Sequence, residues 1–122
     1  MAYMSQERKK EIAAELKEAL KGSGIRYSLR VRHHSTIVMT VQSGPIDFEA
    51  DWISDYDFHY QVNVYHYRRM FEGASLAFLE KVLPILNRGN FDKSDSMTDY
   101  FHVGWYVDVN LGRWDRPYQV AA

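Results

Sequence analysis

The sequence predicts a single α+β domain spanning residues 1–122, with a mostly antiparallel sheet of about four strands and helices packed on one face. Three observations predict this class. The 122 residues are 46% apolar, which suits one globular domain and leaves too little chain for two separate cores. The hydrophobic period switches between helical and strand values in the order α-β-β-β-α-β. Cysteine is absent, which excludes a disulfide-stapled scaffold.

The N-terminal segment Ser5–Lys21 is expected to be an amphipathic helix. Its apolar residues recur at helical spacing at Ile12, Leu16 and Leu20. Ser5 is a suitable N-cap because its hydroxyl can accept a hydrogen bond from a free backbone N–H of the first turn.

The next segment predicts a β-hairpin. Polar and apolar residues alternate over Arg26–Arg32, and a second strand is expected over Thr36–Gln42. The turn falls at residues 33–35, and so short a connection permits only antiparallel pairing. A third strand is expected over Phe58–Tyr65, after an acidic loop at residues 46–56.

The C-terminal half predicts a helix and a last strand. The helix begins between Gly73 and Ser75, and Pro84 predicts a kink or a break near Val82 because proline removes a backbone donor. The last strand is expected over Tyr100–Leu111. The tail, residues 112–122, carries Trp114 and Tyr118, and we expect much of it to be pinned to the body of the domain.

Charge is distributed unevenly along the chain, although the formal net charge is only −1. Residues 1–46 hold eight Lys or Arg against four Glu, whereas residues 47–58 hold five acids and no Lys or Arg. Two interpretations stay open: solvated segments that balance one another, or a bipolar surface made for a charged partner.

Two surfaces are candidates for binding a partner. On the first strand, Arg26, Arg30 and Arg32 share one face if the alternation holds, and His33 and His34 extend the patch. Guanidinium groups at this spacing match phosphates or an acidic protein surface, or else they only keep the sheet solvated. The alternative surface is the acidic loop around Trp52, taken over residues 47–57, with Asp55 and Asp57 as its charged members.

Catalytic and metal-binding motifs are weak. Three histidines and two aspartates near strands could serve a small enzyme: His59, His66, His102, Asp99 and Asp108. Their spacing matches no zinc-binding motif, and the acidic segment with Asp92, Asp95 and Asp99 lacks the glycine of a calcium loop. We therefore expect no metal and no cofactor. Phosphate-binding loops and nucleophile elbows are also absent.

The C-terminal block SDSMTDYFHVGWYVDVNLGRWDRPY, residues 94–118, resembles small accessory proteins of phages, prophages and conjugative plasmids. These are similar to domains found inside large polyvalent proteins. The segments Ile25–Arg30, Val62–His66 and Phe71–Ser75 fit the same resemblance, which covers roughly residues 12–118. It implies a mobile-element protein acting inside a bacterium, with no reaction or catalytic residue attached.

These observations favour a non-enzymatic protein that binds a macromolecule. The foremost expectation is a host or element-encoded protein as the partner, and the resemblance suggests a target in host defence or replication. Nucleic acid bound by the Arg and Tyr side chains of the sheet is the first alternative, and a small His/Asp enzyme is the second. We expect no secretory signal, no membrane span and a bacterial cytosolic location. A homodimer built on a sheet edge is compatible with each of these functions.

Overall fold

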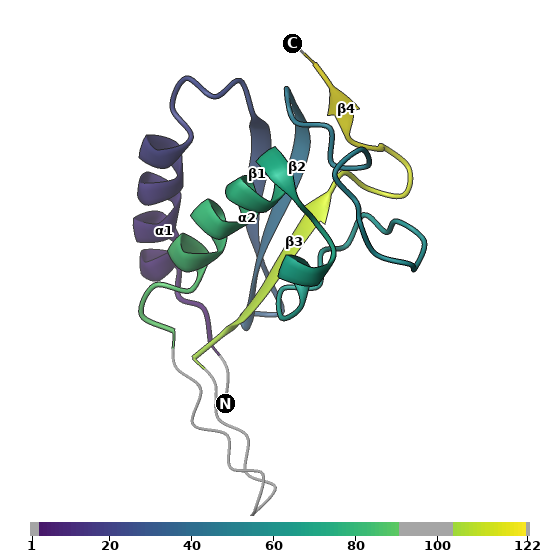
Figure 1. The fold of residues 1–122 in the computed structure, drawn as a ribbon. Coiled ribbons are helices and arrows are strands. Elements are labelled where there is room, and N and C mark those ends of the chain that lie inside the picture. The colour runs from purple at the N-terminus through teal and green to yellow at the C-terminus, as the bar shows by residue number, and fades with distance from the viewer. Residues whose placement is uncertain (1–2, 91–103, 122) are drawn as a thin grey trace, which may run out of the picture.

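The computed structural model describes residues 3–90 and 104–121 (Figure 1). Its elements, in chain order, are α1 (Gln6–Ala19), β1 (Arg26–Arg32), β2 (Thr36–Gly44), η1 (Tyr67–Arg69), α2 (Gly73–Leu86), β3 (Tyr106–Leu111) and β4 (Gln119–Val120). The α+β class is confirmed. The predicted order α-β-β-β-α-β is wrong, because the observed order is α-β-β-α-β-β.

The sheet is mixed, where a mostly antiparallel one was predicted. β2 lies between β1 and β3; it runs antiparallel to β1, as the hairpin requires, and parallel to β3. β4 pairs in parallel with the end of β2. The β2–β3 pair is parallel because the long connection between them, which contains α2, returns the chain to the end of the sheet where β2 begins.

The third strand predicted over Phe58–Tyr65 is wrong. This segment meets the sheet along the outer edge of β3, where Gln61 forms an isolated antiparallel bridge with Asn110. The chain then turns, because the Asn63 side-chain oxygen accepts a hydrogen bond from the backbone N–H of Tyr65 at 3.0 Å. Such an Asx turn offers the backbone an alternative to strand pairing.

The helices and one face of the sheet enclose a single apolar core (Figure 1). Ile37, Met39 and Val41 of β2 are fully buried and belong to the same cluster as Leu16 of α1 and Leu79 of α2. Removing these side chains from water is the main favourable contribution to folding.

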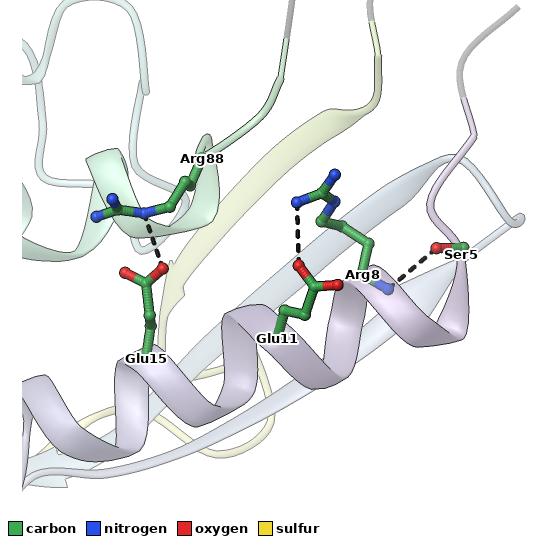
Figure 2. A network of polar contacts seen from close by, with 5 residues as sticks. All are labelled: Ser5, Arg8, Glu11, Glu15 and Arg88. Atoms are coloured by element: carbon green, nitrogen blue, oxygen red, sulfur yellow. Dashed lines mark hydrogen bonds and ion pairs between the residues drawn. The ribbon is translucent and has the colours of Figure 1, made fainter.

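The two helices are also joined at their surface. The Ser5 hydroxyl caps α1 by accepting from the Arg8 backbone N–H at 3.0 Å, which confirms the predicted N-cap. Figure 2 shows this cap beside the ion pairs of Arg8 with Glu11 (3.1 Å) and of Arg88 with Glu15 (2.8 Å). The second pair links α1 to the chain just after α2. Exposed pairs of this kind each contribute at most about 1 kcal/mol.

α2 starts at Gly73, as predicted, and continues through Pro84 to Leu86. The predicted break near Val82 is therefore wrong. Pro84 lies in the last turn of the helix, so the missing backbone donor removes one hydrogen bond near the helix end and the helix stops two residues later. Among residues 3–90 and 104–121, no helix is long and apolar enough to cross a membrane.

Candidate functional site: the open face of the sheet

The face of the sheet opposite the core is polar and is called the open face here. Because strand side chains alternate, the residues between the core positions lie on it. Its members are Arg26, Ser28, Arg30 and Arg32 of β1, Thr36, Val38, Thr40 and Gln42 of β2, and Tyr106, Asp108 and Asn110 of β3. Cross-strand rows such as Arg30–Val38–Asp108 place a small β2 residue between longer neighbours. This row and the row Arg32–Thr36–Tyr106 are low in the centre, whereas Ser28 is the shortest member of the row Ser28–Thr40–Asn110.

The three predicted arginines all lie on the open face and all are exposed. Arg32 reaches across β2 and forms an ion pair with Asp108 of β3. Within the described part of the chain, Arg26 and Arg30 form no ion pair. Their positive charge is thus available to a ligand, whereas that of Arg32 is already neutralised.

A tight turn after β3 adds residues that sequence reasoning missed. Gly112 and Pro117 form an isolated bridge, and the backbone N–H of Arg113 donates to the carbonyl of Arg116 at 2.8 Å. Trp114 therefore sits at the tip of a two-residue loop and is 83% exposed, so the expectation that the tail is pinned fails at this residue.

Only glycine fits the first position of this turn. Gly112 has a φ of +89°, and an added Cβ would lie 2.3 Å from the backbone nitrogen of Tyr118. A Gly, Asp and Pro within one short stretch is a turn signal, and it was the available clue to this loop.

The open face has three hollows, called the first, second and third here, with volumes of about 500, 390 and 700 Å³ in that order. The first contains Tyr65, Tyr106 and Arg32, and it shares Arg32 and Gln61 with the second. The second brings Arg30 together with Arg113 and Trp114. The third contains Arg26 and Arg116 and shares Arg113 with the second. The lining residues include five arginines and two aspartates, so the surface is basic although the whole chain is not.

The predicted histidines lie at the end of this surface. His33 and His34 form the β1–β2 turn, with φ values of 54° and 58°. Left-handed backbone at two successive non-glycine residues is unusual and matches the turn type that hairpins favour. Both side chains are exposed, and neither lines any of the three hollows.

The acidic loop is a separate surface. Trp52 is half-buried, with its ring centroid 5.2 Å from that of Phe71, and its indole N–H donates to the carbonyl of Tyr56 at 2.7 Å. Asp55 and Asp57 are exposed. None of these predicted partner-binding residues lines a hollow of the open face.

Another acid of the same region has a structural role. The carboxylate of Asp51 accepts hydrogen bonds from the backbone N–H (3.0 Å) and the hydroxyl (2.5 Å) of Ser75, which is fully buried. This carboxylate supplies the side-chain cap that Glu72, the N-cap residue of α2, does not provide. Asp51 therefore ties the acidic loop to the start of α2.

Among the described residues, those considered for an enzyme do not form a cluster that could hold a metal. The His59 ring stacks on Tyr60 with centroids 4.8 Å apart, and its Nδ1 accepts from the backbone N–H of Gln61 at 3.1 Å. Asp108 is held by Arg32, and His66 is exposed at the start of η1. In residues 3–90 and 104–121, no group of three or more His, Cys, Asp or Glu could bind a metal ion. His102, Asp92, Asp95 and Asp99 lie outside the described residues.

The clearest electrostatic coupling lies away from the open face. The Arg68 guanidinium donates two hydrogen bonds to Glu80, at 2.7 and 3.0 Å, and these lower the pKa of that carboxyl. Burial, together with the hydrogen bond to Glu80, raises the pKa of Tyr67. This trio joins η1 to α2 and belongs to the framework of the domain.

The chain matches no protein-family model, no curated protein and no solved structure. The resemblance to phage and plasmid accessory proteins therefore stays a prediction.

Proposed function

We propose that this chain is a non-enzymatic binding protein that captures an anionic macromolecule on the open face of its sheet. The observation that carries the proposal is the placement of Arg30 and Arg113. These residues come from opposite sides of the sheet, line the same hollow and form no ion pair within the described residues. Arg is the preferred residue for binding carboxylate and phosphate groups because its planar fork donates two parallel hydrogen bonds.

The mobile-element context enters as part of this proposal. A phage or plasmid protein acting inside a bacterium would use the open face against a host or element-encoded target. The resemblance supports that setting, and the geometry of the open face supports the binding surface.

The test compares two double charge reversals. Arg30→Glu with Arg113→Glu changes the open face and leaves the Arg32–Asp108 pair intact. The α1 variant, Lys17→Glu with Lys21→Glu, makes the same change of charge at two exposed residues, one in the last turn of α1 and one just after the helix. Binding to heparin, polyglutamate and oligonucleotides is measured by fluorescence anisotropy or competition.

We expect at least one of these polyanions to bind the wild-type protein, and the open-face variant to weaken that binding by about tenfold or more. The α1 variant is expected to change it by less than about twofold, because distant charges are screened by salt. Equal losses in both variants, or no binding of any polyanion, would overturn the proposal.

A further inference from the structure

The three hollows of the open face lie next to one another in a row, which is called the groove here. The first and second share Arg32 and Gln61, and the second and third share Arg113 and Asp115. The groove therefore runs from the Tyr65 end of the sheet to Arg26 and Arg116. β1 spans about 20 Å along it at the usual strand rise, which suits an elongated ligand.

The centre of the groove is polar. Hydroxyl and amide side chains of the sheet line it, namely Thr36, Thr40, Gln42 and Asn110, with Gln61 beside them. The one apolar side chain of β2 on this face, Val38, is fully buried. Protein–protein interfaces have a dry centre enriched in apolar and aromatic residues. Thr40 and Asn110 instead offer hydrogen-bond donors and acceptors at the centre, which favours a polar ligand there, whereas Val62, Val64 and Val107 line the Tyr65 end.

Cations border the groove on two sides. Arg26 and Arg30 lie on β1, while Arg113 and Arg116 lie on the turn after β3, about 10 Å away across β2 at the usual strand spacing. All four are exposed and form no ion pair within the described residues. Such an arrangement follows a charged backbone along its length rather than a single anionic group.

Exposed aromatic rings stand at one end of the groove and in its middle. Trp114, which is 83% exposed, lines the second hollow, and Tyr65 and Tyr106, 83% and 50% exposed, line the first. Exposed rings beside a basic groove stack with unpaired bases, and each stacked base typically contributes about 1–3 kcal/mol. In a duplex the base faces are already stacked and unavailable to these rings.

The geometry points to single-stranded nucleic acid as the ligand of this groove, with phosphates at the four arginines and a base stacked on Trp114. This inference rests on the proposed function, because it names the class of anionic macromolecule that the open face binds. DNA and RNA share the required phosphates and unpaired bases, so the test includes both.

The experiment measures binding of labelled oligothymidylate and oligouridylate by fluorescence anisotropy between about 50 and 200 mM salt. A duplex of the same length and polyglutamate of matched charge serve as competitors. Trp114→Ala removes the stacking ring, and Tyr56→Ala removes a ring of similar exposure (78%) that lies on the acidic loop.

We expect a single strand to bind about tenfold more tightly than the duplex or polyglutamate. Trp114→Ala is expected to weaken single-strand binding by about fivefold or more, whereas Tyr56→Ala leaves it unchanged. Each phosphate contact adds about −0.7 to the slope of log K against log salt for a single strand. Four arginines therefore predict a slope near −3, and Arg30→Glu is expected to make it shallower.

The outcomes separate the two proposals. If polyglutamate or heparin binds as tightly as the oligonucleotides and Trp114→Ala has no effect, the nucleic-acid inference fails and the anion-binding function stands. Tighter binding of the duplex also overturns the inference. If no polyanion binds the wild-type protein, both proposals fail.

Discussion

The two faces of one sheet differ in what covers them. On β2, Ile37 and Met39 face the helices. Thr36, Val38 and Thr40 alternate with them and face the opposite way, and all five are buried. The first set is covered by apolar side chains of the core, and the second lies low between the longer polar side chains of neighbouring strands. Burial alone therefore does not separate a core from a binding surface; the chemistry of the covering groups does.

The largest expected effect contrasts the two faces directly. Met39→Ala removes a fully buried core side chain and should lower the free energy of unfolding by about 2–5 kcal/mol. Arg30→Ala on the open face should change it by less than about 0.5 kcal/mol. Urea denaturation followed by circular dichroism measures both. Similar losses for the two variants would mean that the open face also carries the stability of the fold.

The second-largest expected effect on the unfolding free energy comes from disrupting the turn that borders the open face. Gly112→Ala forces both a left-handed φ on alanine and a close contact with the Tyr118 backbone. We expect a loss of more than about 1 kcal/mol in unfolding free energy. Gly22→Ala is the matched control, because Gly22 has a φ of +77° with no atom within 4 Å of the added Cβ. If the two variants lose equal stability, the close approach at Gly112 has no energetic consequence.

A smaller effect separates framework acids from surface acids. Asp51→Ala removes the two hydrogen bonds to Ser75 at the start of α2 and should cost about 1 kcal/mol in thermal or urea unfolding. Asp55 is exposed, and Asp55→Ala should lower the free energy of unfolding by less than about 0.5 kcal/mol. If Asp51→Ala leaves the free energy of unfolding unchanged, the capping role is refuted.

The smallest effect depends on pH and lies on the helical side. The pKa of Glu80 is lower in the folded chain than its ordinary value because Arg68 donates hydrogen bonds to it. A depressed carboxyl pKa contributes stability above the unfolded-state pKa, and this contribution is lost as pH falls through the folded-state value. Glu80→Gln should therefore be less stable than wild type at neutral pH, with the difference shrinking below about pH 4.5. Melting temperatures across pH 3 to 7 measure this, and a difference that grows at low pH would contradict it.

Local patterns predicted much of the framework. The Ser5 cap, the hairpin and the start of α2 at Gly73 each depend on residues close together in the chain. The arginine face of β1 was predicted for the same reason, since alternation within a strand fixes which side chains share a face.

Contacts between distant segments were not predictable in this way. Phe58–Tyr65 alternates like a strand, yet Asn63 turns the chain after a single bridge to β3. Asp51 caps a helix through a residue 24 positions away. Arg113 and Arg116 line the same hollows as Arg30 and Arg26. They do so because β3 is parallel to β2, which places the turn after β3 beside the open face.

The most direct test of the central claim locates the ligand on the protein. Amide chemical shifts of isotopically labelled protein are recorded during titration with oligothymidylate and, in parallel, with polyglutamate. We predict the largest changes at open-face and turn residues, which include Arg30, Thr40, Asn110 and Arg113. Changes centred on α1 or on the acidic loop around Trp52, or no saturable change with either polymer, would contradict the assignment of the open face as the binding surface.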